Sequence, residues 1–203
     1  MSDSAQEFPV YARARRAHRV AKARVLDGLP LTWEDVDTAP SWLAIGEPDA
    51  RERLCAHVGG WWLMAALKAC IDGKRLVKVR DLLGEELLAR LHGPADERSA
   101  ALLDQAPRPM LPLEKDISAY LLACGRGLLS WDLPSRLKAL VPEHLGWHVK
   151  ELDYAVFDNH DVWARYALEM AQQENLPSSP PSLPSSPSPS PPPPLDSKPK
   201  ASE

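Results

Sequence analysis

Apolar residues recur every three or four positions in several stretches of this sequence, which is the spacing of one face of an α-helix. No stretch alternates apolar and polar residues with a period of two, and β-branched residues are sparse. The pattern therefore predicts an all-α fold. Helices are expected over residues 10–26, 48–73, 74–94, 95–107, 113–132, 133–142, 143–157 and 160–175.

Glycine and proline residues, which interrupt helices, indicate where the predicted helices begin and end. Gly84 interrupts the range 74–94, which predicts either one helix or two short helices hinged there. Pro134 suits the first position of a helix, whereas Gly146 weakens the prediction for 143–157. Residues 31–48 are predicted to form an irregular connector, which its tryptophans anchor to the core.

The helix expected over 48–73 is apolar nearly all round beyond its first turn, and such a helix is buried. Gly59 and Gly60 in its middle would let another helix approach closely. Its apolar residues are Leu54, Val58, Trp61, Trp62, Ala65 and residues 67–69.

Composition divides the chain into three parts. Residues 176–203 are almost all Pro, Ser or charged, with too little apolar surface to offset the entropy of ordering them, so this tail is predicted to be disordered. Residues 29–175 are predicted to form one globular all-α domain, and residues 1–28 a basic N-terminal helix.

That first helix carries six basic residues and no acid between Tyr11 and Val25, although the whole chain has a net charge of −4. A cationic helix can simply be solvated, or it can dock on an acidic protein, anionic lipid or nucleic acid. Nucleic acid fits worst because the rest of the chain is acidic, and lipid is disfavoured by the small apolar residues. An acidic protein is the best of the three. The basic residues are Arg13, Arg15, Arg16, Arg19, Lys22 and Arg24.

Cys55, His57 and Cys70 raise the possibility of a metal site. On one helix the two thiols stand about 22 Å apart at 1.5 Å per residue, too far to share an ion whose ligands lie within about 2.3 Å. His57 points away from Cys55 because the two are separated by two positions. We therefore predict that these cysteines, with Cys124, are small core residues.

A second candidate for chemistry is a group of histidines near the C-terminal end of the domain. His144 and His148 are four residues apart and could share a helix face, and His160 could join them if the last two helices fold together. Surface histidines near helix ends explain the same pattern. The sequence contains no phosphate-binding loop and no nucleophile elbow, so no catalytic residue, cofactor or metal ligand is predicted.

Three cysteines do not form a disulfide framework and suit a reducing compartment. The N-terminus has no apolar segment typical of a signal peptide. The longest apolar run is about half the length that a membrane span needs. We expect a cytoplasmic protein that is not inserted in a membrane.

Three stretches resemble the K subunit (SctK/YscK type) of the cytosolic sorting platform of bacterial type III secretion systems. They are "PSWL" at 40–43, "RERLCAHVGGWWLMAALKACIDGKRLVKVRDLLGEELLARL" at 51–91, and "PLEKDISAYLLACGRGLLSWDLPSRLKALVP" at 112–142. The likeness rests on helical pattern and a few residues, and it contains no diagnostic motif. The basic first helix and the Pro/Ser tail depart from the family pattern.

The resemblance implies a non-enzymatic adaptor at the cytosolic face of the bacterial inner membrane. Such an adaptor links the cytosolic domain of the inner-membrane ring to the pod (Q) subunit, and it has no catalytic residue to carry over. The residues expected to bind partners come from physical reasoning alone: a basic face, and two tryptophans expected near the surface. They are Arg13, Arg15, Arg16, Arg19, Trp33 and Trp42.

Two other functions stay open at this point. A chaperone or regulator could hold an acidic client through the basic helix, and its binding would be sensitive to salt. Less favoured is a small helical metal-binding enzyme that uses His144, His148 and His160.

Overall fold

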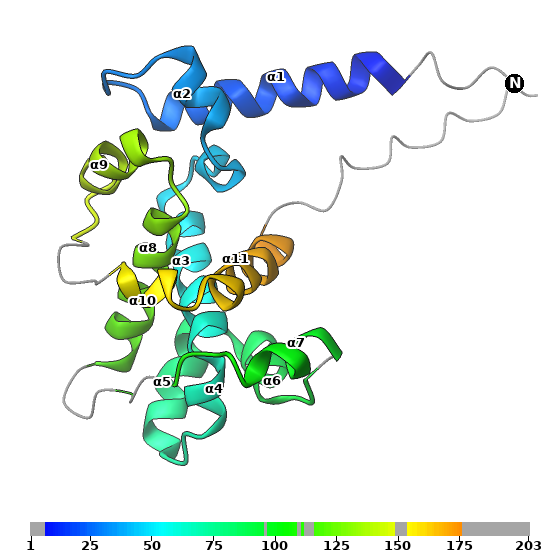
Figure 1. The fold of residues 1–203 in the computed structure, drawn as a ribbon, viewed down its shortest axis with the longest axis vertical. Coiled ribbons are helices and arrows are strands. Elements are labelled where there is room, and N and C mark those ends of the chain that lie inside the picture. The colour runs from blue at the N-terminus through cyan, green and yellow to red at the C-terminus, as the bar shows by residue number, and fades with distance from the viewer. Residues whose placement is uncertain (1–6, 96, 109–110, 112–115, 149–153, 176–203) are drawn as a thin grey trace, which may run out of the picture.

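The computed structural model describes residues 7–95, 97–108, 111, 116–148 and 154–175. Within these ranges it contains eleven α-helices, one 3-10 helix and no strand, which confirms the predicted all-α class (Figure 1). The predicted tail at 176–203 lies outside the described residues. The elements are α1 (Glu7–Val25), α2 (Trp33–Thr38), η1 (Ser41–Ala44), α3 (Pro48–Trp62), α4 (Met64–Lys68), α5 (Gly73–Leu83), α6 (Glu85–His92), α7 (Glu97–Leu103), α8 (Ile117–Trp131), α9 (Ser135–His144), α10 (Ala155–Asp158) and α11 (Asp161–Asn175).

Helices α3 and α8 form the centre of the molecule, and α11 packs against α3 (Figure 1). The segment containing α1, α2 and η1 lies at one end of the long axis, and α4, α5 and α6 lie at the other. The side chains of Leu54, Val58, Leu121 and Leu128 are fully buried in this centre. None of the described helices is long and apolar enough to cross a membrane.

Two glycines bring α3 and α8 into backbone contact. A Cβ atom added to Gly59 would overlap the carbonyl oxygen of Leu121, and one added to Gly125 would overlap the carbonyl oxygen of Cys55. Gly59 thus lies against the backbone of Leu121, one turn before Gly125, and Gly125 lies against the backbone of Cys55, one turn before Gly59. The expectation that another helix closely approaches Gly59 is confirmed, and α8 is that helix.

Aromatic rings fill the space between α3, α10 and α11. Trp62 meets Phe157 edge to face with ring centroids 4.9 Å apart, and Trp61 meets Tyr166 in the same way at 5.9 Å. The indole N–H of Trp163 donates to the carbonyl of Trp62 at 3.1 Å. Ring packing of this kind stabilises a core beyond area burial alone, so the tryptophans fix α11 against α3.

The single helix predicted over 48–73 is wrong. Helix α3 ends at Trp62, Leu63 has φ −94° and ψ 10°, and the chain restarts as the short helix α4. Asp72 then caps α5 by accepting hydrogen bonds from the backbone N–H groups of Lys74 and Arg75. Apolar periodicity could not locate this break because residues on both sides of it are buried.

Glycines with positive φ mark two other helix ends. Gly84, at φ 84°, separates α5 from α6, so the two-helix alternative for this stretch is the correct one. Gly146, at φ 70°, follows the end of α9, so the helix predicted over 143–157 is wrong at its start. Part of that prediction, residues 149–153, lies outside the described residues.

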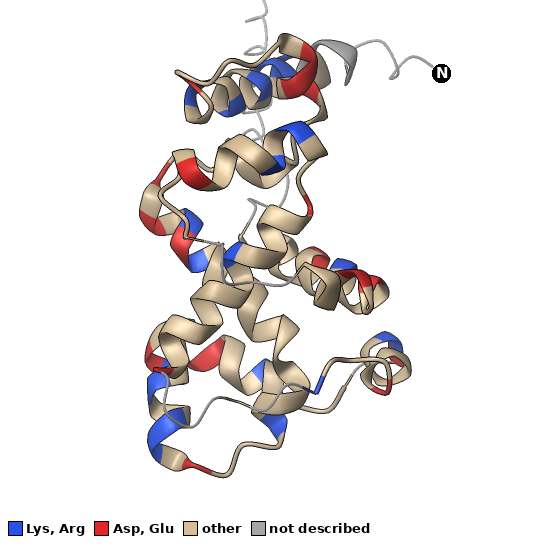
Figure 2. Cartoon of the chain, turned by 60° about the vertical axis from the view of Figure 1, so that its left-hand side comes forward, with Lys and Arg blue, Asp and Glu red and all other residues tan. Residues whose placement is uncertain are grey.

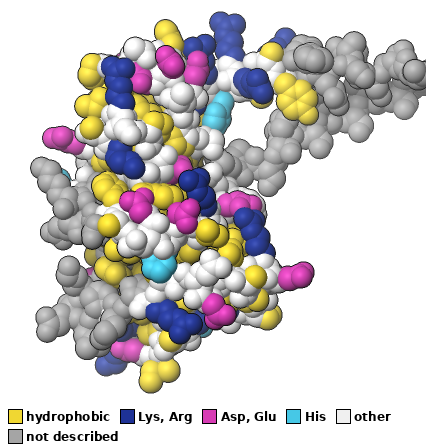
Figure 3. Space-filling view, viewed as in Figure 1, with side chains coloured by type: hydrophobic (Ala, Val, Ile, Leu, Met, Phe, Trp, Pro, Cys, Tyr) yellow, Lys and Arg dark blue, Asp and Glu magenta, His cyan; other side chains and the backbone are white. Residues whose placement is uncertain are grey.

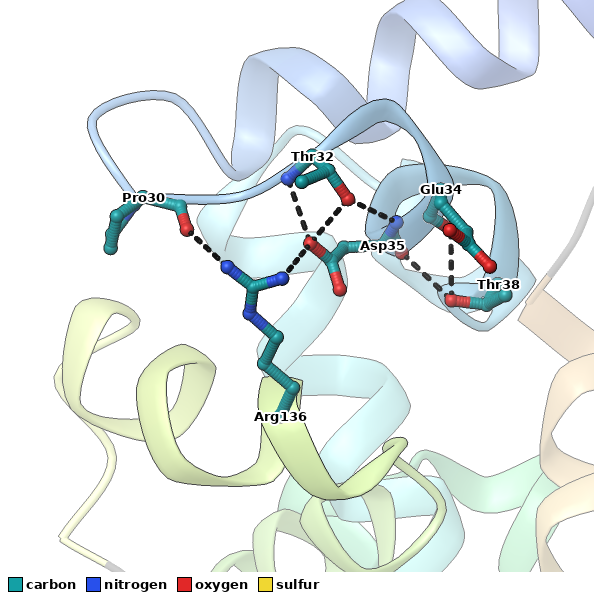
Figure 4. Close-up of polar contacts among 6 residues, drawn as sticks. All are labelled: Pro30, Thr32, Glu34, Asp35, Thr38 and Arg136. Atoms are coloured by element: carbon teal, nitrogen blue, oxygen red, sulfur yellow. Dashed lines mark hydrogen bonds and ion pairs between the residues drawn. The ribbon is translucent and has the colours of Figure 1, made fainter.

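The loop between α1 and α2 is tied to α9 by Arg136. Its guanidinium donates to the carbonyl of Pro30 at 3.1 Å and pairs with Asp35 at 3.0 Å (Figure 4). Asp35 also closes a capping box with Thr32 at the start of α2. The backbone N–H of Thr32, its hydroxyl and Arg136 together lower the pKa of Asp35. These contacts join the N-terminal segment to the body.

We predict that Gly125→Ala lowers the free energy of unfolding by about 3 kcal/mol or more. Denaturant titration would measure the change. The added methyl group would meet backbone rather than a side chain that can rotate away, so α3 and α8 must separate.

Gly46→Ala is the matched control, because nothing lies within 4 Å of a Cβ atom there and its φ is not positive. Its free energy of unfolding should stay within about 0.5 kcal/mol of the wild type. Equal stability of the two variants would contradict the proposed contact between the helices.

Candidate partner-binding surface

The first half of α1 extends beyond the rest of the molecule (Figure 1). Every residue from Tyr11 to Ala17 is exposed, including Ala14 and Ala17, which share the apolar spacing of this helix. Isolated helices of this length are marginal in water, and tertiary packing normally stabilises them. The exposed half of α1 therefore has the character of a surface that lacks its partner.

The second half of α1 is anchored by Leu26 and Lys22, both buried. The ammonium group of Lys22 donates to the carbonyl of Ala39 at 2.8 Å, just after α2 ends, and lies 3.4 Å from the carbonyl of Asp37. A cation at a helix C-terminus is favourable because that end is partly negative. Burial lowers the pKa of Lys22, the attraction of Asp37 opposes this, and Arg19 adds to the lowering.

A hollow of about 720 Å³ lies between α1 and α2. Five cationic or titratable side chains of α1 and one carboxylate of α2 line it, together with Ala14. The five from α1 are Arg15, Arg16, His18, Arg19 and Lys22, and the carboxylate is that of Asp37. Burial first, and then the charge of Lys22, lowers the pKa of His18.

Arg19 has two neighbours at the rim of this hollow. Its guanidinium pairs with Asp37 at 2.8 Å and lies over the ring of Trp33 at 4.8 Å from the centroid. Trp33 remains 63% exposed, so it contributes an apolar ring to the surface beside the cations. Figure 2 marks the Lys and Arg positions along the ribbon at this end of the molecule, and Figure 3 shows basic side chains over α1. The surface thus contains Arg19 paired with a carboxylate, the exposed indole of Trp33, and two further arginines, Arg15 and Arg16.

Of the six residues predicted to bind partners, five are exposed, four of them on α1 and one on α2. They are Arg13, Arg15, Arg16, Arg19 and Trp33.

The surface placement predicted for Trp42 is wrong: its side chain is fully buried, and it stacks on Trp147 with centroids 5.8 Å apart. Trp42 belongs to η1, which packs under α1, and its alternative prediction as an anchor of the connector is the correct one. Trp33, by contrast, does not anchor the connector in the core.

The cysteines differ from one another in their surroundings. Cys55 and Cys124 are buried, as predicted, and burial raises the pKa of each thiol to about 12. Cys70 is only half-buried, so its assignment to the core is wrong. Cys70 follows α4 and lines a second hollow, which lies beside α4 and the turn after it, because the chain turns there instead of continuing as a helix.

The three histidines do not form one group. His144 hydrogen bonds to the carbonyl of Val25 at 2.9 Å, and His160 to the carbonyl of Gln105 at 3.0 Å. His148 lies beyond the end of α9, so it cannot share a helix face with His144. Among the described residues, no three His, Cys, Asp or Glu side chains are placed to hold a metal ion.

Sequence reasoning missed His18, Lys22 and Asp37 as parts of this surface. Arg15, His18, Arg19 and Lys22 follow the spacing i, i+3, i+4 and i+7, which places them on one helix face. That spacing was a usable signal. Asp37 could not be identified, because its place beside Arg19 depends on how α2 packs.

Comparisons with protein families, with curated proteins and with solved structures found no match for this chain.

We predict that Lys22→Met lowers the free energy of unfolding by about 1–2 kcal/mol, because the carbonyls at the end of α2 lose a charged hydrogen-bond donor. Thermal and denaturant unfolding would measure the change. Arg24→Met is the matched control, since Arg24 is an exposed residue of the same helix. Equal stability of the two variants would show that Lys22 does not hold α1 to α2.

Proposed function

We propose that this chain is a non-enzymatic adaptor of a type III secretion sorting platform, linking the cytosolic domain of the inner-membrane ring to the pod subunit. The resemblance that suggests this spans residues 40–142. In the structure this range runs from η1 to α9 and includes the contact between α3 and α8. The resemblance thus covers the body of the domain rather than its N-terminal helix.

The observation that carries the proposal is the exposed basic half of α1, held on a packed body by Lys22 and Leu26. An adaptor needs a body that keeps its shape and a surface that another protein can complete. The arginines of α1 and the ring of Trp33 supply such a surface. Tyrosine, tryptophan and arginine are also the residues that contribute most to binding at protein interfaces.

A second surface at the opposite end of the molecule supports a role that joins two partners. A hollow of about 620 Å³ lies beside α4 and the turn that follows it. Ala65, Ala69 and Leu103 contribute apolar lining, and the side chain of Ile71 at its edge is 98% exposed. The two surfaces lie at the two ends of the long axis (Figure 1), so two proteins could bind without competing.

A chaperone or regulator that holds an acidic client is the second candidate. The cationic lining of the hollow between α1 and α2 favours it. The two functions differ in what the opposite end does: an adaptor needs both ends, whereas a client-binding chaperone needs only α1.

The test is a capture experiment with the full chain. The tagged protein should capture the ring protein's cytosolic domain and the pod subunit from the same organism. Ile71→Asp should abolish capture of one of them, and Arg15→Glu with Arg16→Glu should abolish capture of the other. High salt should weaken only the interaction made by the arginines.

Two results would contradict the adaptor. Capture of neither protein by a folded chain, checked by circular dichroism, would reject the assignment to the sorting platform. Loss of both partners on changing the arginines, with no effect of Ile71→Asp, would favour the chaperone or regulator.

A further inference from the structure

We propose that the hollow between α1 and α2 binds an acidic segment of a partner protein, whose carboxylates pair with Arg15 and Arg16 next to Arg19, the residue whose guanidinium lies over the ring of Trp33. This inference rests on the proposed function only in taking α1 as a docking surface. It adds where on α1 the partner sits and which chemistry it presents.

Arg15, Arg19 and Lys22 follow one another at intervals of about one turn on the same face of α1. Near the end of the helix this face packs on the protein: Lys22 binds the carbonyl of Asp37, in the last turn of α2, and that of Ala39, just after α2. One turn earlier, Arg19 binds the carboxylate of Asp37. Another turn earlier, Arg15 is exposed. The protein itself supplies the oxygen atoms that Lys22 and Arg19 contact, whereas the guanidinium of Arg15 is open to a carboxylate from another protein.

The pair of Arg19 and Asp37 shows the kind of group that this face accepts. A carboxylate lies 2.8 Å from the guanidinium of Arg19, and the indole of Trp33 covers that guanidinium from another side. Arginine pairs well with carboxylates because its planar fork matches their geometry. A Glu or Asp on a partner would make the same contact with Arg15 or Arg16.

Charge favours a compact acidic segment over a long polyanion. The six basic residues of 11–25 stand on a chain of net charge −4, so the rest of the chain carries ten net negative charges. An acidic segment confined to the hollow would meet its cations and a single carboxylate, that of Asp37, which is already paired with Arg19. A nucleic acid or an anionic membrane would extend past α1 and face the negative remainder of the protein.

The aromatic and apolar residues also favour a protein segment over nucleic acid or lipid. Among the side chains that the structure describes, the exposed rings at this end are Tyr11 and Trp33, which lie on different helices and do not form the series of stacking platforms that single-stranded nucleic acids use. Within residues 11–25, three of the five exposed apolar residues of α1 are alanines, which give little area for insertion into lipid. A protein segment with alternating acidic and apolar side chains could use both the arginines and Trp33.

The experiment measures binding of a labelled peptide of alternating Glu and Leu to the full chain by fluorescence anisotropy. We expect salt-sensitive binding that weakens about tenfold in Arg15→Glu with Arg16→Glu, which is the effect of losing a few exposed ion pairs. Trp33→Ala should weaken it as well. A peptide with Gln in place of Glu should not bind.

Arg53→Glu with Lys74→Glu is the matched control. It makes the same change in net charge at exposed positions of α3 and α5, and it should bind the peptide within about twofold of the wild type. Equal weakening by the two pairs of substitutions would overturn the proposed site. So would tighter binding of single-stranded DNA or of anionic phosphatidylserine vesicles than of the Glu peptide.

The outcome is independent of the sorting platform. If the Glu peptide does not bind while the chain still captures the ring domain or the pod subunit, the acidic docking site is wrong and the adaptor stands. If the peptide binds through Arg15 and Arg16 while neither platform protein is captured, the docking site stands and the adaptor is wrong.

Discussion

The whole structure depends on the backbone contact between α3 and α8. Gly59 and Gly125 lie where each helix meets a carbonyl group of the other, and neither position has room for a Cβ atom. Because the two axes approach so closely, the side chains beside the glycines become buried on both helices. The tryptophans at the end of α3 can then pack against α10 and α11. The body is held by this contact and by the aromatic residues around it.

The N-terminal segment is attached through both apolar and polar contacts. Leu26 and Val36 are buried in the core, Lys22 binds at the end of α2, and Arg136 connects the loop of Pro30 with the capping box of Asp35. They secure the second half of α1 and leave its first half exposed. The same helix therefore serves two purposes, since one end joins the body and the other presents arginines. A binding surface carried in this way can be completed by a partner without disturbing the core.

The sequence predicted the helical class, most helix positions and the basic surface, because these follow from local spacing and composition. It also indicated that Gly59 marks a close approach. It could not identify Gly125 as the second half of that contact, since pairing two helices requires knowledge of the tertiary fold. The break at Leu63 was missed for the same reason, and the sequence could not decide whether Trp42 anchors the connector in the core or lies at the surface. Asp37 is part of the candidate surface only because α2 packs beside Arg19.

We propose that a partner protein covers the first half of α1, which is exposed in the isolated chain. Amide hydrogen exchange tests it directly, by comparing residues 11–17 with the residues of α3 in the free protein and with the ring domain or pod subunit added. Unpacked helical turns open easily and exchange fast, whereas buried helices exchange slowly. The account predicts fast exchange at 11–17 in the free chain and strong slowing in one of the two complexes. Protection equal to that of α3 in the free chain, or no change with either protein, would contradict it.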